Sequence, residues 1–373
     1  MINLNRGQFK KALLLVLMIL LWMVGIYFFC QGIDEVSIHV NNPENQEMEE
    51  AIQQIFDKRN QAIRDEDKDY LMKLYDRKVK AGLYSYEHEV RKMEYLHQWE
   101  YKQGVQFNSI DSKIFLRKLN KKGEGYFVTL AVTTEYTYQY EGGSRTNSFR
   151  LGTYHSLDLL PHEEGWMISK EWYLDPFADS LNLDEDKIEK IKEIIASHDE
   201  RELPEFNERR LGALEYMDQH CGVARPPDYS FRYNSEYRNY NSLGGDCTNF
   251  ASQILFEGGG FRKNSTWNYN RGGGTKAWLN AHGFNQYMLY SGRGSLIQRG
   301  TYEQVLRNSY NLLPGDYIAY EKKGEVAHIS FVSALDTKGY ALVNSHNSDR
   351  FRVPWEVGWS DAGITFWLVR VNY

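Results

Sequence analysis

The pattern of apolar and polar positions divides the chain into four segments, and the first contains an unbroken apolar run from Ala12 to Cys30. Nineteen helical residues at 1.5 Å each extend about 28 Å, close to the roughly 30 Å hydrocarbon core of a membrane. Basic residues precede the run and large aromatic residues end it, which disfavours a cleaved signal peptide or a lipid-modified Cys30. We therefore expect residues 1–33 to form a cytoplasmic tip and an uncleaved transmembrane anchor, with the remaining chain extracytoplasmic.

The second segment, residues 34–181, changes from a helical to an alternating period. Between residues 45 and 105, apolar side chains such as Ile52, Phe56 and Ile63 recur at helical spacing. From residue 106 apolar and polar positions alternate, and Gly142-Gly143 predicts a hairpin turn. Helices followed by antiparallel strands predict an α+β domain with one curved sheet wrapped on helices. This order resembles the NTF2-like fold.

The highly charged residues 182–210 have a helical period and predict a solvated helix and linker. In the last segment, residues 211–373, one apolar stripe at helical spacing predicts a helix. Its members are Cys247, Phe250, Ala251, Ile254 and Leu255. Asp246 is expected to cap this helix, which places Cys247 in its first turn. The unpaired N–H groups and dipole of a helix start favour the thiolate, so we expect a lowered pKa for Cys247.

The residues that follow predict three strands that carry chemistry. His328 opens the middle strand, and Ser330 and Val332 share its face by the period of two. On the next strand Asn344 and His346 share one face. A thiol on a helix, packed against a sheet with an imidazole and a polar group that orients it, is the arrangement of a thiol acyl-transfer site.

The segment Gly-Gly-Asp-Cys-Thr-Asn-Phe-Ala-Ser at residues 244–252 resembles the bacterial putative amidase domain family. The segment LPGDYIAY and the downstream Ala327-His328-Ile329 match the same pattern. That family belongs to a wider papain-like group with the CHAP and NlpC cell-wall hydrolases. The resemblance covers about residues 210–373 and implies a papain-like domain, in which a helix packs on an antiparallel sheet.

Carried over to this chain, the resemblance implies that Cys247 is the nucleophile and that His328 is the general base and then the acid. Either Asn344 or His346 would orient the imidazole. The backbone N–H of Cys247 is a candidate oxyanion donor. Asn241 lies at the offset at which papain-like enzymes place a side-chain amide, although a turn-forming role fits it equally well. Asp246 is expected to support the site structurally as the helix cap, and its charge, which would oppose formation of the thiolate, is expected to tune the pKa of Cys247.

Composition excludes several other functions. The 373 residues include 50 acidic and 44 basic side chains, a net charge of -6, which argues against a partner bound through a basic surface such as nucleic acid. Three cysteines are too few for a disulfide scaffold and lack the spacing of metal ligands. The glycine tracts at 258–260 and 272–274 lack the Gly-Lys-Ser/Thr of a phosphate loop. We therefore expect neither a metal nor a cofactor.

These observations favour a membrane-anchored extracytoplasmic cysteine amidase or peptidase. Peptidoglycan stem peptides, the muramoyl–alanine amide or another cell-wall peptide are the expected substrates, because the anchor and the relatives both point to the wall. Two alternatives stay open. One is a catalytically silent protein that binds the wall or a partner, and the other is a transglutaminase-like acyl transferase with the same triad.

Overall fold

The computed structural model describes residues 43–373, apart from residues 164, 178–184, 271–272 and 360–362. The predicted anchor, residues 1–33, lies outside this range. Within the range no helix has the length and apolar character needed to cross a membrane. The described residues belong to a single compact unit.

The N-terminal half contains three helices followed by four strands, as predicted. The helices are α2 (Pro43–Arg64), α3 (Lys68–Lys73) and α4 (Lys80–Gln103), and the strands are β1 (Val105–Lys122), β2 (Gly125–Tyr140), β3 (Thr146–His162) and β4 (Gly165–Tyr173). Each strand pairs antiparallel with the next. Ile52, Phe56 and Ile63 of α2 are buried in one core with the sheet, because their spacing gives the helix a single apolar face. This confirms the α+β class, while the NTF2-like resemblance stays a prediction.

The C-terminal half follows the charged segment, which forms α5 (Glu185–Ala196). Its helices are α6 (Glu208–Gln219), the 3-10 turn η2 (Asn241–Leu243), α7 (Cys247–Gln253) with its π-helical continuation η3 (Ile254–Gly258), α8 (Lys276–Leu279), α9 (Ala281–Tyr290) and α10 (Tyr302–Ser309). Its strands are β5 (Tyr269–Asn270), β6 (Gly273–Gly274), β7 (Gly294–Gly300), β8 (Tyr317–Lys322), β9 (Glu325–Leu335), β10 (Ala341–Ser345), β11 (Arg350–Pro354) and β12 (Ile364–Val371). The helix at Cys247 and the three strands that carry the candidate residues are confirmed.

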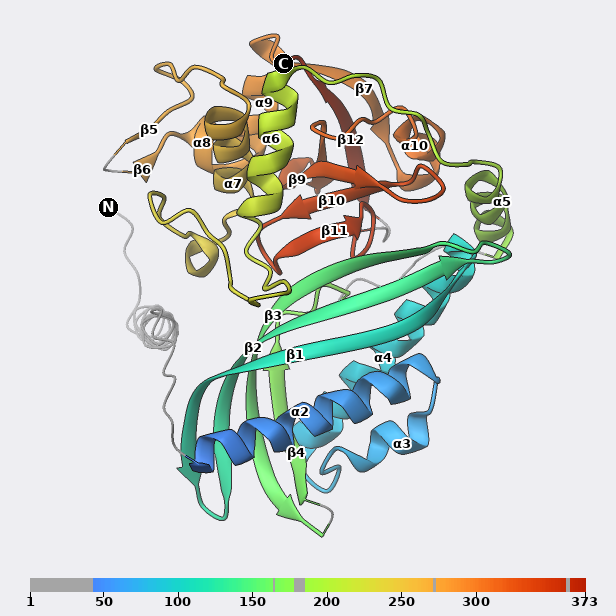
Figure 1. Ribbon diagram of the computed structural model, residues 1–373, viewed down its shortest axis with the longest axis vertical. Helices are drawn as coiled ribbons and strands as arrows, with labels where there is room; N and C mark the ends of the chain where they lie inside the picture. Colours follow the sequence, from blue (N-terminus) through green and yellow to red (C-terminus); the bar gives the residue numbers. More distant parts are fainter. Residues whose placement is uncertain (1–42, 164, 178–184, 271–272, 360–362) are drawn as a thin grey trace, which may run out of the picture. The chain divides into compact units, whose positions relative to one another are not determined.

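The two halves share one ten-stranded sheet (Figure 1), in the order β1-β2-β3-β11-β10-β9-β8-β12-β7 with β4 beside β3. The connection is made where β3 pairs with β11, Leu151 with Arg350 and Arg150 with Phe351. Gly152 extends it, because its N–H donates to the carbonyl of Asp349 at 2.8 Å. A Cβ at residue 152 would lie 3.2 Å from the Cβ of Asp349, so the close approach favours glycine.

The sheet separates two apolar cores. Helices α6 to α9 pack on one face of the C-terminal strands, together with Ile329 and Phe331 of β9. The opposite face, with Tyr320 of β8 and Val332 of β9, belongs to the core that also contains α2, α4 and α10. Alternate residues of β9 therefore face α7 on one side and the core of the N-terminal half on the other.

A buried ion pair connects α4 to the turn that follows β11. Lys102 and Glu356 are both 0% exposed, and Lys102 Nζ lies 2.5 Å from Glu356 Oε1. Trp99 Nε1 donates to the same carboxylate at 2.9 Å. The hydroxyl of Tyr95 accepts a hydrogen bond from the N–H of Gly358 at 2.7 Å. Residues 95, 99 and 102 lie on one face of a helix, so α4 holds the whole turn.

Replacement of Lys102 by Met tests this contact. The variant leaves the Glu356 carboxylate buried without its cation, and we expect a loss of about 3–5 kcal/mol in the free energy of unfolding, measured by urea denaturation. The double variant Lys102→Met/Glu356→Gln removes the unpaired charge and should regain a large part of the loss. A single variant as stable as the parent would contradict the role given to this ion pair.

Candidate functional site

Cys247 is the first residue of α7 and is only 6% exposed. The chain enters the helix through Gly244 and Gly245, whose φ angles are 113° and 124°. A Cβ at residue 245 would lie 2.3 Å from Asn347 Nδ2, so both the backbone angle and the space favour glycine. The predicted sharp turn before the nucleophile candidate is therefore present.

The expected lowering of the pKa of Cys247 is wrong. Burial raises the pKa of this thiol above its usual range, and hydrogen bonds to the Ile329 backbone and to Thr248 oppose that rise only in part. The Sγ atom lies 3.6 Å from Thr248 Oγ1. Removal of the thiol from water is the largest influence on this pKa, and the nearby charge of Asp246 acts in the same direction. The resting side chain is a neutral thiol.

Asp246 occupies the position before α7, but its side chain makes no capping hydrogen bond, so the predicted capping role is wrong. Its Oδ1 accepts hydrogen bonds from the Tyr240 N–H and from Asn249 Nδ2, both at 2.9 Å. Its Oδ2 lies 2.6 Å from His346 Nδ1. The carboxylate instead joins α7, the loop before it and the end of β10.

His346 is held at both ring nitrogens. Nδ1 faces Asp246, and Nε2 lies 2.8 Å from the carbonyl oxygen of His220, which can only accept a hydrogen bond. Burial alone would lower the pKa of His346, but the hydrogen bond to Asp246 and its charge raise it above the ordinary value. The imidazolium form is therefore favoured, and neither nitrogen is free to accept a proton.

His328 lies in a different environment, on β9. Its ring stacks on Trp359 with centroids 5.0 Å apart, and its Nε2 lies 3.0 Å from Ser330 Oγ and 3.2 Å from Ser345 Oγ. Burial, together with the nearby charge of Arg350, lowers the pKa of His328 to about 3. The imidazole is therefore neutral at physiological pH, and it is a weak base.

The thiol and the imidazole lie on either side of the same strand. The Cys247 thiol contacts the backbone of Ile329, the residue after His328. Ile329 packs on the α7 side of the sheet, whereas His328 contacts the ring of Tyr320 on the opposite face, with centroids 5.4 Å apart. Among the residues described, no hydrogen bond joins Cys247 to His328, so the catalytic pair stays a prediction.

Two asparagines were candidates for supporting roles, Asn344 for orienting the imidazole and Asn241 for binding the oxyanion. Asn344 Nδ2 donates to the Met217 carbonyl at 3.2 Å and to Asp218 Oδ1 at 3.0 Å, away from His328. Asn344 pairs with Phe331 across the strands, so it shares the α7 face, and Ser345 reaches His328 instead. Asn241 begins η2, and its buried Oδ1 has no hydrogen-bond partner in the described part of the chain.

Sequence reasoning missed three neighbours of His328, namely Ser345, Arg350 and Trp359. The period of two had placed Ser330 on the face of His328. Placing Ser345 there as well required the register between β9 and β10, which the sequence pattern does not contain. Trp359 follows a turn whose position depends on α4, some 250 residues earlier in the chain.

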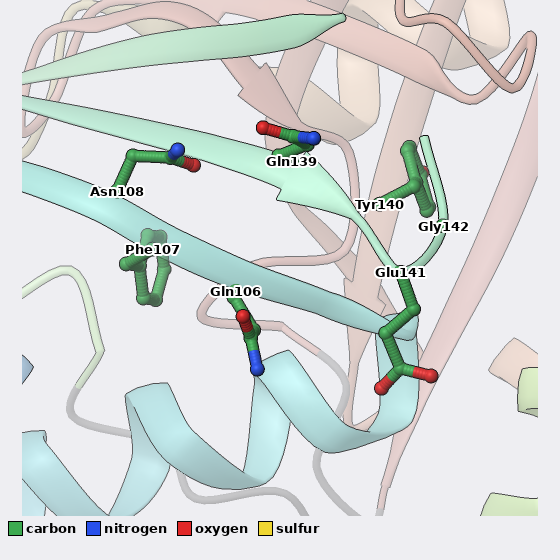
Figure 2. A pocket seen from close by; sticks show the side chains of 7 residues that line it. All are labelled: Gln106, Phe107, Asn108, Gln139, Tyr140, Glu141 and Gly142. Atoms are coloured by element: carbon green, nitrogen blue, oxygen red, sulfur yellow. The ribbon is translucent and has the colours of Figure 1, made fainter. Parts of the chain in front are cut away.

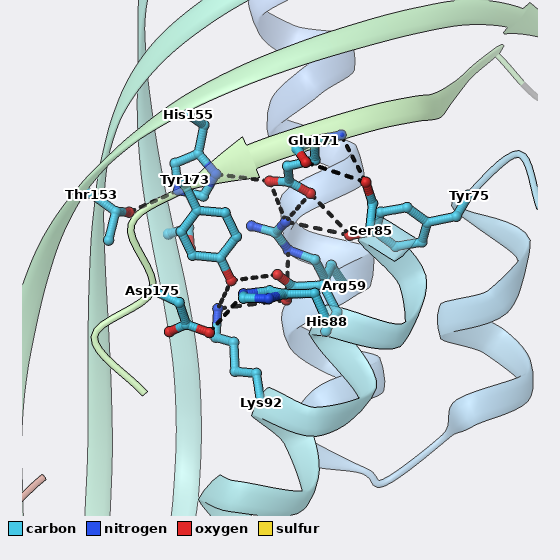
Figure 3. Close-up of polar contacts among 12 residues, drawn as sticks. Arg59, Tyr75, Ser85, His88, Lys92, Thr153, His155, Glu171, Tyr173 and Asp175 are labelled. Carbon is cyan, nitrogen blue, oxygen red and sulfur yellow. Dashed lines mark hydrogen bonds and ion pairs between the residues drawn. The ribbon is translucent and has the colours of Figure 1, made fainter. Parts of the chain in front are cut away.

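A second group of buried polar side chains lies between the helices and the sheet of the N-terminal half (Figure 3). Arg59 Nη1 donates to both carboxylate oxygens of Glu171, at 2.9 and 3.1 Å, and His155 Nδ1 lies 2.7 Å from Glu171 Oε1. His88 Nε2 lies 2.8 Å from Asp175 Oδ2. Each of these carboxylates has a cationic or imidazole partner, so the group forms an ion network that joins α2, α4 and the sheet.

The N-terminal half also has a polar surface hollow of about 350 Å³ at the start of β1 and the end of β2 (Figure 2). The side chains of Gln106, Asn108, Gln139 and Glu141 line it. None of the candidate site residues lies there. Across the part of the chain that the structure describes, no three His, Cys, Asp or Glu side chains are grouped to hold a metal ion.

Comparison with known proteins finds a family match for the C-terminal half. Residues 207–369 match the sequence model of the putative amidase domain family. The uncharacterized protein YhbB of Bacillus subtilis is 28% identical over 183 residues, which are 45% of this chain and 49% of that protein. A pelota homolog of Methanococcus maripaludis is 29% identical over 124 residues, 32% of this chain and 34% of that protein.

The chain thus spans about half or less of the length of these curated relatives. Among solved structures, the intermembrane space region of the chloroplast protein ARC6 aligns with a TM-score of 0.23 and 13% identity, over 36% of this chain and 96% of that one. A score of this size does not establish a shared fold. The family match indicates hydrolysis of amide bonds as the class of activity.

The raised pKa of Cys247 predicts its reactivity toward iodoacetamide. Because only the thiolate reacts, the rate at Cys247 should rise about tenfold per pH unit from pH 7 to 9 and show no plateau there. Peptide mass spectrometry would resolve the labelled cysteine, and Cys221→Ser provides the matched control. A rate already constant between pH 6 and 8 would show that the resting residue is a thiolate.

Proposed function

We propose that the C-terminal half, residues 211–373, hydrolyses an amide bond with Cys247 as the nucleophile. The observation that supports this most directly is the position of Cys247 at a helix start, behind a sharp glycine turn and against the backbone of β9. The match of residues 207–369 to an amidase family supports the same class of reaction.

We assign the role of proton acceptor to His328, as the resemblance implies, although its pKa of about 3 makes it a weak base at rest. Both nitrogens of His346 are bonded and its pKa is raised, so it would have to lose a proton before it could act as a base. His328 is neutral, and Ser330 and Ser345 hold one nitrogen and leave Nδ1 for the reaction. Ser345 therefore takes the orienting role that the resemblance assigned to Asn344 or His346.

In the proposed reaction the thiol attacks the amide carbonyl while His328 takes its proton. The tetrahedral intermediate collapses to an acyl-enzyme, and His328 returns the proton to the leaving amine. Water, deprotonated by His328, then releases the acid and the thiol. These steps require the thiol and the imidazole to come within hydrogen-bonding reach. Because the two side chains lie on opposite faces of β9, this requires a rearrangement of the strand itself.

The developing oxyanion needs preorganised donors. The backbone N–H of Cys247, at the start of α7, supplies one. The amide of Asn241 is the second candidate, and its buried Oδ1 has no partner that would fix the side chain elsewhere. The Asp246 carboxylate supports this arrangement through its hydrogen bonds to Asn249 and His346.

The proposed substrate is a peptide of the bacterial cell wall, either a stem peptide or the muramoyl–alanine amide. The predicted anchor at residues 1–33 would hold the enzyme in the membrane with residues 34–373 on the extracytoplasmic side. A catalytically silent wall or partner binder is the second candidate. It is favoured by the buried neutral thiol and by the lack of a described hydrogen bond between Cys247 and His328.

The variant Cys247→Ala tests the nucleophile. We expect it to abolish the release of amines and the change in mass when the protein is incubated with purified wall fragments, because no thioester can form. Cys221→Ser is the matched control, since Cys221 is also buried but is not placed at the site, and it should retain parental activity. Release by Cys247→Ala at the parental rate would rule out the proposed mechanism.

The variant Ser345→Ala tests the orienting role. Loss of one hydrogen bond to His328 Nε2 should lower kcat by about tenfold with little change in KM, because Ser345 is buried and would act through His328. The circular dichroism spectrum and unfolding midpoint would report any structural damage. An unchanged kcat would mean that Ser330 alone, or another group, orients the imidazole.

A further inference from the structure

Arg350, the first residue of β11, is a buried cation that has no carboxylate partner among the residues the structure describes. It is 4% exposed, and within the described residues its side chain makes no ion pair. Its one hydrogen bond there runs from Nη1 to the carbonyl oxygen of Val357, at 2.7 Å. Buried charges in proteins are generally paired, because an uncompensated charge is strongly disfavoured in an apolar interior. Burial accordingly lowers the pKa of Arg350.

A donor of Arg350 itself lacks a partner. Its Nε atom is buried and makes no hydrogen bond to the described residues, and the same holds for Nε1 of Trp359 in the turn after β11. Since Nη1 is engaged by Val357, the guanidinium edge formed by Nε and Nη2 carries no hydrogen bond from the described residues. An unsatisfied buried donor needs a partner from outside the chain, such as an ordered water or a bound anion, or else it costs stability.

The surrounding groups do not supply the missing charge. Glu356, whose charge acts on Arg350, is bound to Lys102 Nζ and to Trp99 Nε1, and its other oxygen accepts from Tyr340 at 2.7 Å. The remaining groups that face this region are neutral polar or aromatic side chains. They are His328, Ser330, Ser345, Tyr320 and Tyr95.

We propose that Arg350 forms a binding site for one carboxylate group, next to His328 and to the turn that carries Trp359. The free Nε–Nη2 edge of the guanidinium matches the two oxygens of a carboxylate. The single uncompensated cation balances one negative charge. A phosphate dianion would bring a second negative charge without a partner. This site does not require Cys247 and therefore goes beyond the proposed hydrolysis.

The position of the site indicates how a ligand reaches it. Trp359 is partly exposed while Arg350 and His328 are buried, so the site meets the surface at Trp359. The carboxylate has two sources, a small free acid or the C-terminal carboxylate of a peptide. In either case the ligand would lie close to the ring of His328, which stacks on Trp359.

The test measures the unfolding midpoint of the full chain in sodium acetate against sodium chloride at equal ionic strength. We expect acetate to raise the midpoint of the parent by a few degrees and to leave that of Arg350→Met unchanged, because ligand binding to the folded state stabilises it. The matched control Arg352→Met lies on the same strand and pairs with Asp218, so it should respond like the parent.

Three further arms keep the result interpretable. If Arg350→Met fails to fold, Arg350→Lys retains the charge but loses the bidentate guanidinium edge. The acetate concentration that gives half of the stabilisation should then rise at least tenfold. Ala-Ala-Ala compared with its C-terminal amide distinguishes a peptide terminus from a free acid, since only the peptide acid should act at lower concentration than acetate. Cys247→Ala should respond like the parent, so loss of activity and loss of binding are separate outcomes. No acetate effect in the parent, or an equal effect in Arg350→Met, would overturn the proposal.

Discussion

The buried ion pair between Lys102 and Glu356 is the contact on which the arrangement around His328 depends. It fixes the turn after β11 against α4, and the same turn accepts the Nη1 bond of Arg350 and presents Trp359 to the imidazole. A buried ion pair generally contributes no more to the free energy of folding than well-packed apolar residues of similar volume, because both charges lose their water. Its value is specificity, since only one placement of the turn satisfies Glu356.

The organisation of the chain could be predicted from sequence wherever the information was local. The stripe of Phe250 and Ile254 behind two glycines was enough to place a helix at Cys247, and the alternating period placed β9 with His328 at its start. The shared sheet could not be predicted in this way, because the pairing of Leu151 with Arg350 joins residues that are distant in sequence. Strand alternation alone does not say which strands from different halves become neighbours.

The candidate site shows the same division. The residue types and their order were sufficient to nominate Cys247 and His328, but their pKa values depend on burial, which is a property of packing. A helix start favours the thiolate, yet the thiol is covered on all sides and stays neutral. Likewise two histidines that look equivalent in sequence differ in structure, because a carboxylate and a carbonyl hold one as a cation while the other is surrounded by aromatic rings and hydroxyls.

The β3–β11 connection has a consequence for the synthesis of the protein. The ribosome releases β3 about 200 residues before β11, which at roughly 5–20 residues per second leaves part of the β3 edge unpaired for about 10–40 s. An unpaired edge is a site at which chains associate wrongly. The nascent N-terminal half therefore has to be kept apart from its neighbours until β11 emerges, and a slow stretch of translation between the two strands would lengthen the interval of risk.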